Sequence, residues 1–71
     1  MDEIVEAVIV AVEDRDWPQI KRLLHPYLFW RESELAIRGR SKVMARLGAG
    51  ATPAAPVSYE LRDGQIYRWT S

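Results

Sequence analysis

The stretch from residue 57 to residue 69 constrains the fold more than any other part of the sequence. Apolar and polar residues alternate from Val57 to Arg62, and the alternation resumes from Gln65 to Trp69. Between the two runs lies Asp63-Gly64, a pair that suits tight turns because both residues tolerate positive φ. The sequence therefore predicts that this stretch forms a β-hairpin.

Two registers fit this hairpin. A loop of two residues, Asp63-Gly64, makes Leu61 face Ile66 and leaves large apolar side chains on both faces. A loop of three residues, Arg62 to Gly64, would gather the large apolar groups on one face, which suits a monomer. Turn chemistry alone does not choose between them. With the shorter loop the other expected pairs are Tyr59 with Arg68 and Glu60 with Tyr67.

The first half of the chain predicts two helices. Apolar residues recur at helical spacing over residues 4–12, with Asp2 placed as the N-cap. Asp16 is the N-cap of a second helix, because Trp17-Pro18 puts a proline in the first turn. Pro26 is expected to end this helix, since the residue before a proline avoids the helical region.

The middle of the chain predicts two strands and a third helix. Residues 27–30, Tyr-Leu-Phe-Trp, are large and apolar without alternation, which is typical of a strand covered on both faces. Residues 35–38 form a second strand, and Ser41 is expected to cap a helix over residues 42–47. Residues 48–56 are a linker rich in glycine and proline. The order is ααββαββ, which indicates a small α+β layer structure.

Composition narrows the class of protein. The 71 residues fit a single domain, 1–71, with a small core. With no cysteine and one histidine, neither disulfides nor the usual zinc ligands are available, and no cofactor is expected. Ten basic and ten acidic side chains make nucleic acid an unlikely partner. No apolar run could span a membrane, and the acidic Asp2-Glu3 contradicts a secretory signal, so we expect a cytoplasmic protein.

Four features spread along the chain occur together in a known family. They are Asp16-Trp17 after the opening helix, Leu23-Leu24-His25-Pro26 with Trp30 on the next strand, Gly39-Arg40 before the third helix, and the closing hairpin from Tyr59 to Trp69. In this order they resemble the nuclear transport factor 2-like superfamily, and within it the small SnoaL-like bacterial proteins. The resemblance implies helices packed on one face of a short, curved, mainly antiparallel sheet, a reduced cystatin-like cone.

The sequence also departs from that family. The linker at residues 48–56 stands where a middle pair of strands is expected, so the sheet is shortened to four strands. The family's catalytic residues have no legible counterparts here. Where a ligand pocket survives, Trp30, Tyr59 and Tyr67 are the residues expected to line it.

Three side chains are candidates for catalysis. His25 is the natural general base because histidine is the side-chain type suited to that role near neutral pH, although a histidine at a helix end needs no further role. Glu60 and Tyr67 could bind or activate a small polar ligand as cross-strand partners, or form an ordinary pair on a sheet face. Asp14 and Asp16 could hold a cation, but Asp16 is already explained as a cap.

Arg38, Arg40, Lys42 and Arg46 form the one basic cluster of the sequence. An anion could bind there, beside the backbone N–H groups at the start of the third helix. Charge is also polarised: residues 1–16 carry six acids and one arginine, whereas residues 17–71 carry nine basic and four acidic groups. A solvated face, or a contact with the acidic first helix, is the alternative explanation.

These observations lead to two hypotheses about function, a binding module and an enzyme. The favoured hypothesis is a homodimeric, non-catalytic module that binds a small apolar molecule or a protein. Three short helices cover only one face of a sheet, so the unalternated strand favours the two-residue loop and a partner subunit held through Tyr67 and Trp69. The alternative is a small hydrolase, isomerase or cyclase of the SnoaL-like kind acting on a hydrophobic substrate, with His25 or Glu60 as the base.

Overall fold

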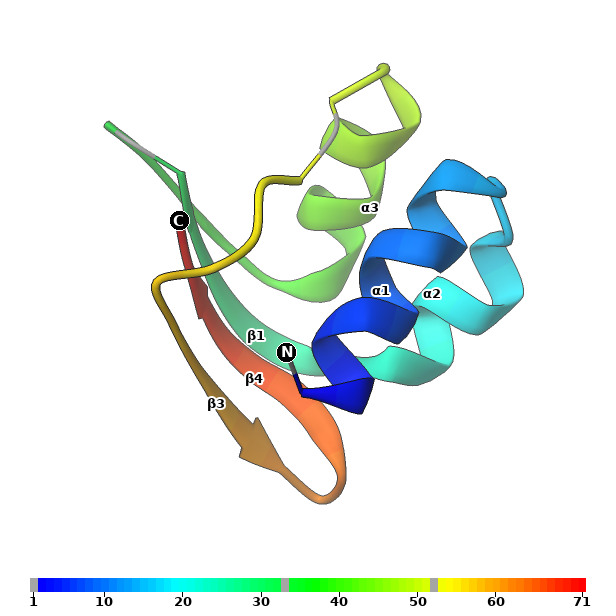
Figure 1. Cartoon of the computed structure of the whole chain (residues 1–71). Helices are drawn as coiled ribbons and strands as arrows, with labels where there is room; N and C mark the ends of the chain where they lie inside the picture. Colours follow the sequence, from blue (N-terminus) through cyan, green and yellow to red (C-terminus); the bar gives the residue numbers. More distant parts are fainter. Residues whose placement is uncertain (1, 33, 52) are drawn as a thin grey trace.

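Three helices lie on one side of a curved four-stranded sheet in the computed structural model (Figure 1), which describes residues 2–32, 34–51 and 53–71. The elements are α1 (Glu3–Glu13), α2 (Trp17–Leu23), β1 (Leu24–Glu32), β2 (Leu35–Arg38), α3 (Arg40–Gly48), β3 (Ser58–Arg62) and β4 (Gln65–Thr70). The predicted α+β class and the order ααββαββ are confirmed. Within the described ranges, no helix has the length and apolar character needed to cross a membrane.

The first two helices begin where the sequence predicts. The side chain of Asp2 accepts a hydrogen bond from the backbone N–H of Ile4, and Asp16 accepts one from that of Gln19. Each bond satisfies a backbone donor that has no partner inside the helix. The third helix differs, because its N-cap is Gly39, at φ 100°, without a side-chain bond. Ser41 lies inside α3 and is not its cap.

The end of α2 also differs from the prediction. The helix stops at Leu23, three residues before Pro26, and β1 already begins at Leu24. Proline is tolerated in a strand where the ladder is irregular, since it has no N–H to donate. The pairing of β1 with β4 shifts between Leu24 and Phe29, the segment that contains Pro26. His25 therefore belongs to a strand and does not close a helix.

The sheet has the order β2-β1-β4-β3 and is mixed. β1 runs antiparallel to β2 and parallel to β4, and β4 runs antiparallel to β3. The parallel pair joins residues far apart in the sequence, such as Phe29 with Arg68 and Trp30 with Trp69. Two of the three pairings are antiparallel, as expected for a mainly antiparallel sheet.

The closing hairpin confirms the two-residue loop. Asp63 and Gly64 both have positive φ, 54° and 76°, and Leu61 pairs with Ile66. Beyond that point the register shifts, because β4 carries one extra residue, Tyr67. Such a bulge changes which side chains share a face. The observed pairs are Tyr59 with Trp69 and Glu60 with Arg68, so the expected pairs Tyr59 with Arg68 and Glu60 with Tyr67 are wrong.

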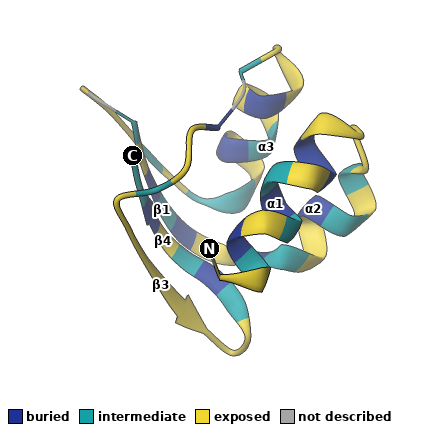
Figure 2. Ribbon diagram, viewed as in Figure 1, coloured by how far each residue is buried: buried dark blue, intermediate teal, exposed yellow. Residues whose placement is uncertain are grey.

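The core lies between the sheet and the helices, and two tryptophans occupy its centre. Trp30 of β1 and Trp69 of β4 have no exposed surface, and their rings stack with centroids 4.8 Å apart and planes at 6°. Figure 2 shows buried residues in β1, β4 and the three helices, while β3 is exposed. The aliphatic core residues are Val5, Val8, Ala11, Val12, Ile20, Leu24, Leu28, Val43, Leu47 and Ile66.

Trp69 was expected on the face turned away from the helices, and this is wrong. The bulge at Tyr67 reverses the alternation of β4, so that Ile66 and Trp69 both point into the core although they are three residues apart. A fully buried side chain has no surface left for a second subunit. Trp69 is therefore a core residue and not an interface residue.

Candidate functional site

The predicted ligand pocket does not form, because its three residues lie in different places. Trp30 is buried against Trp69, and its Nε1 donates a 2.8 Å hydrogen bond to Glu32. The hydroxyl of Tyr59 reaches Asp2 at the start of α1. Tyr67 lies on the opposite face of the sheet, against His25. The stacked tryptophans thus occupy the centre of the space between sheet and helices.

The contact between Tyr59 and Asp2 perturbs both groups. The Tyr59 hydroxyl, and then the backbone N–H of Ile4, stabilise the carboxylate and hold the pKa of Asp2 below its ordinary 3.8. The same hydrogen bond raises the pKa of Tyr59 above 10.0, since the phenolate could no longer donate it. Both groups are exposed, and their bond ties β3 to α1 at the rim of the core.

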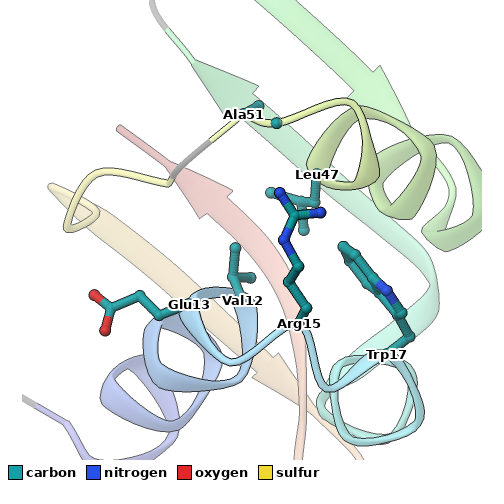
Figure 3. Close-up of a pocket in the computed structure, with 7 residues that line it drawn as sticks. Val12, Glu13, Arg15, Trp17, Leu47 and Ala51 are labelled. Atoms are coloured by element: carbon teal, nitrogen blue, oxygen red, sulfur yellow. The ribbon is translucent and has the colours of Figure 1, made fainter.

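A first cavity, of about 150 Å³, opens between the ends of the helices. Figure 3 shows the Arg15 side chain beside the Trp17 ring and extending toward Leu47 and Ala51. Val12, Glu13 and Gly50 complete the lining. The cavity is smaller than the roughly 300 Å³ typical of small-molecule sites. None of the residues predicted for a site lines it.

The helix-free face of the sheet carries a continuous row of polar and aromatic side chains. Trp30 points into the core, so its neighbours Phe29 and Arg31 point to the opposite face. Phe29 pairs across β1 with Arg38 of β2 on one side and with Arg68 of β4 on the other. Arg68 in turn pairs with Glu60 of β3. The row Arg38, Phe29, Arg68, Glu60 therefore crosses all four strands.

A second hollow, of about 120 Å³, lies on this face and is lined by Phe29, Arg38, Tyr67 and Arg68. The Arg38 guanidinium carbon lies 6.0 Å from the centre of the Phe29 ring. Next to the hollow, that of Arg62 lies 4.3 Å from the centre of the Tyr67 ring. These are cation–π distances, which place positive charge over aromatic faces. The hollow thus combines planar apolar walls with guanidinium groups.

Of the three catalytic candidates, the structure brings two together. The His25 and Tyr67 rings meet edge to face at 5.2 Å. Glu60 does not join them, because its Oε2 accepts from Arg68 Nε at 3.2 Å. His25 Nδ1 accepts from the backbone N–H of Tyr27 at 3.1 Å, and Nε2 lies 3.8 Å from Asp63 Oδ2. With Nδ1 already bound and Nε2 facing a carboxylate, His25 is placed as a structural residue of the bulged strand.

The predicted basic cluster is not assembled. Arg40 donates to the backbone carbonyls of Lys21 and Leu24, and Arg46 donates to Glu32 Oε2 at 3.0 Å. Lys42 is exposed on α3. Only Arg38 reaches the hollow, because β2 and α3 leave Gly39 in different directions and separate residues that are close in sequence. The cluster is therefore not an anion site at the start of α3.

Sequence reasoning missed Phe29, Arg62 and Arg68 as residues of this surface. The sequence pattern makes Phe29 one of four equivalent apolar residues, and the regular hairpin register pairs Arg68 with Tyr59. The sequence did hold a signal, because the closing hairpin carries two arginines, Arg62 and Arg68, beside large apolar residues. It could not be used without the parallel pairing of β1 with β4, which no local pattern encodes.

Among the described side chains, no group of three or more histidines and carboxylates could hold a metal ion. Asp14 and Asp16 fit this result, as Asp14 is the C-cap of α1 and Asp16 the N-cap of α2. The cap accounts for the Asp16 carboxylate, which accepts from the backbone N–H of Gln19, whereas Asp14 ends α1 through its backbone N–H.

Comparison with known proteins identifies the fold and nothing finer. No protein-family model and no curated protein matches the chain. Its structure is similar to the crystal structure of a Sinorhizobium meliloti protein proposed to be a polyketide cyclase, with a TM-score of 0.78 and 15% identity. The alignment covers 99% of this chain and 94% of that chain. The chain thus has the α+β cone fold that its resemblance to nuclear transport factor 2-like proteins implies, with three helices against a four-stranded mixed sheet.

Proposed function

We propose that the protein is a non-catalytic binding module that takes a planar anionic molecule on the helix-free face of its sheet. The observation that carries this proposal is the hollow in which guanidinium groups adjoin the rings of Phe29 and Tyr67. A carboxylate or phosphate of the ligand pairs with Arg38 and Arg68. The planar part lies against the two aromatic rings.

The chemistry of the hollow suits such a ligand. A guanidinium group is planar and binds carboxylate or phosphate through two parallel hydrogen bonds. An aromatic wall adds stacking that an aliphatic ligand cannot use. A volume of about 120 Å³ approaches that of a cavity of roughly 150 Å³ that can hold benzene. The hollow therefore has room for one ring or one anionic group, while the rest of a larger ligand stays on the surface.

Two contacts favour binding over catalysis. A general base needs a lone pair that can reach the proton it removes. In His25 the Nδ1 lone pair already accepts a backbone N–H, and Glu60 is held by Arg68. The similarity to a proposed polyketide cyclase supplies the alternative, a cyclase with His25 or Glu60 as base and Tyr67 as hydrogen-bond donor. That alternative requires both contacts to break.

The expected homodimer competes with an anionic ligand for the same face. Tyr67 remains on the surface and could enter an interface, whereas Trp69 could not. A two-fold contact through this face would place Arg31, Arg38, Arg62 and Arg68 of one copy against those of the other. The repulsion among like charges opposes that contact. We therefore favour the anionic ligand as the occupant and treat the dimer as an outcome to be measured.

The test is a titration with naphthoate, a planar aromatic carboxylate, followed by two-dimensional NMR of the backbone amides. We expect the largest shifts at Phe29, Arg38, Tyr67 and Arg68, and weaker binding of cyclohexanecarboxylate, which has the same charge but no aromatic ring. Arg38→Gln and Arg68→Gln should each weaken naphthoate binding about tenfold. Lys42→Gln, which removes one positive charge elsewhere on the surface, should not.

Several outcomes would contradict the proposal. Shifts confined to the cavity around Arg15 and Trp17, or equal binding of the two carboxylates, would show that the hollow is not the site. If the protein sediments as a dimer and Tyr67→Glu dissociates that dimer, the result would favour this face as a subunit interface and not as a ligand site. Turnover of a polyketide-like substrate that is lost in His25→Gln would favour the cyclase.

A further inference from the structure

The helix-free face extends beyond the hollow as a surface of aromatic and basic side chains. Tyr27 is 71% exposed and lies on β1 close to the hollow, with its ring 5.9 Å from that of His25. Phe29 follows it two residues later, and Tyr67 lies on the neighbouring strand. The surface thus presents three aromatic residues on two adjacent strands, which we call the aromatic platform: Tyr27, Phe29 and Tyr67.

Arginines surround the aromatic platform on each strand. Arg38 and Arg62 lie over its rings, Arg68 pairs with Phe29 across the sheet, and Arg31 follows Phe29 on β1. Glu60 forms an ion pair with Arg68 and offsets its positive charge, and Asp63 lies near His25 at the hairpin turn. The balance of charge on this face is therefore positive.

The whole chain has a formal net charge of zero, but the fold places its acidic and basic groups on different sides of the molecule. The six acids of residues 1–16 are carried by α1, its flanking turns and the helix caps, on the side of the molecule that holds the helices (Figure 1). The four arginines named above lie on the opposite side of the sheet. Neutrality of the whole chain therefore says little about the affinity of one face for a polyanion.

We infer that the helix-free face binds single-stranded nucleic acid, with bases on the aromatic platform and phosphates on the surrounding arginines. This inference rests on the proposed function, since a nucleotide is a planar group joined to an anion, and a strand repeats that unit. Tyr27 is exposed and Phe29 and Tyr67 are half-buried, so this face offers aromatic rings beside arginines, the two kinds of group that sequence-tolerant recognition of a single strand uses.

The spacing of the platform suits successive bases. Neighbouring strands are about 4.8 Å apart, which sets the separation of β1 from β4, and Tyr27 precedes Phe29 by two residues within the irregular segment of β1. A single strand can turn its bases toward rings at this separation because they are not held in a duplex. A duplex hides its bases in the stack, and the face of a sheet offers no helix or ribbon for a groove. The surface therefore discriminates between single and double strands.

The experiment measures fluorescence anisotropy of labelled oligothymidylate and oligouridylate of about eight nucleotides, a length within the range covered by small single-strand binding domains. We expect dissociation constants of about 10⁻⁴ to 10⁻⁶ M at physiological salt. Contacts from Arg31, Arg38 and Arg62 predict a slope of log K against log salt of about −2. The corresponding duplex and the mononucleotides should bind at least tenfold more weakly, as they lack free neighbouring bases.

Variants distinguish the contacts of the arginines with phosphates from the stacking of bases on the aromatic rings. Arg38→Gln and Arg62→Gln should each reduce the salt slope by about 0.7. Tyr27→Ala should weaken binding about fivefold or more without changing that slope, because it removes stacking and no charge. Lys42→Gln is the control for total charge and should change neither quantity. Thermal unfolding of each variant checks that the sheet is intact.

The outcomes also separate this inference from the proposed function. No binding of the oligonucleotides, or equal binding of single strand, duplex and heparin, overturns the inference. If naphthoate still shifts the amides of the hollow in that case, the proposed function stands alone. If neither naphthoate nor oligonucleotide shifts them, both are wrong.

Discussion

On the helix side of the sheet, Trp30 and Trp69 stack with no exposed surface, whereas on the other side Phe29 and Tyr67 lie beside arginines at cation–π distances. Each face is lined by aromatic residues of the same two strands, β1 and β4. The first pair is closed off by helices and makes a core. The second has no described helix over it and remains available to a ligand.

The comparison shows that aromatic content alone does not indicate what a surface does. A large aromatic side chain buries roughly 150–250 Å² wherever it is covered, so it can stabilise a core or a complex equally well. What distinguishes the two faces is the neighbouring chemistry, which is aliphatic on one side and cationic on the other. Substitutions made on each face test whether the two faces differ in this way.

The largest effect is expected from removing a stacked tryptophan. Trp69→Ala should lower the free energy of unfolding by about 3–5 kcal/mol, because the lost ring leaves a cavity in a small core. Tyr27→Ala removes an aromatic group from the other face, where it is 71% exposed, and should cost less than about 1 kcal/mol. Urea unfolding of the two variants measures both values. Similar losses would show that the two faces are not energetically distinct.

A finer comparison lies within the core pair. Trp30 Nε1 donates to Glu32, whereas Trp69 Nε1 is buried without a partner among the described residues. Trp30→Phe breaks a hydrogen bond to a charged group, and Trp69→Phe breaks none. We expect Trp30→Phe to be less stable than Trp69→Phe by about 1–2 kcal/mol, as measured by denaturant unfolding. Equal stabilities would mean that the bond to Glu32 contributes nothing net.

The ion pairs of the two faces should differ by a smaller amount. The side chains of Arg46 and Glu32 are 42% and 18% exposed, and those of Arg68 and Glu60 are 62% and 57% exposed. Double-mutant cycles with glutamine should give a coupling of about 0.5–1 kcal/mol for the first pair and less than about 0.5 kcal/mol for the second, because solvent screens the exposed pair more. A larger coupling for Arg68 with Glu60 would show that this ion pair is more than an exposed contact.

The smallest effect concerns the rim between the two faces, where Tyr59 donates to Asp2. Since the pKa of Asp2 is lowered on folding, its contribution to stability is present above the unfolded value near 3.8 and is lost as the pH falls through the folded value. For Tyr59 the pKa is raised, so its contribution is present below 10.0 and is lost as the pH rises through the raised value.

Tyr59→Phe should therefore return the pKa of Asp2 toward 3.8, which an NMR titration of the Asp2 carboxyl carbon measures directly. Tyr27→Phe removes a hydroxyl from the other face and serves as the control. An Asp2 pKa that is the same in Tyr59→Phe and in the parent protein would exclude the hydroxyl as the cause of the shift.

The sequence by itself determined the features that depend on neighbouring residues. Asp2 and Asp16 cap their helices, and Asp63-Gly64 marks the position of the hairpin turn, because these effects act within three or four residues. The alternating and unalternated runs likewise indicated the strands. The number and order of elements follow from such local patterns.

Only the tertiary structure decided which side of the sheet each aromatic residue occupies. The extra residue at Tyr67 reverses the alternation of β4, and that sends Trp69 inward and Arg68 outward. The order of the strands also places Arg38 and Arg68 on either side of Phe29, although 30 positions separate the two arginines in the sequence. The physical reason is that a bulge costs little locally, so its position is set by the packing of β1, β4 and the helices together.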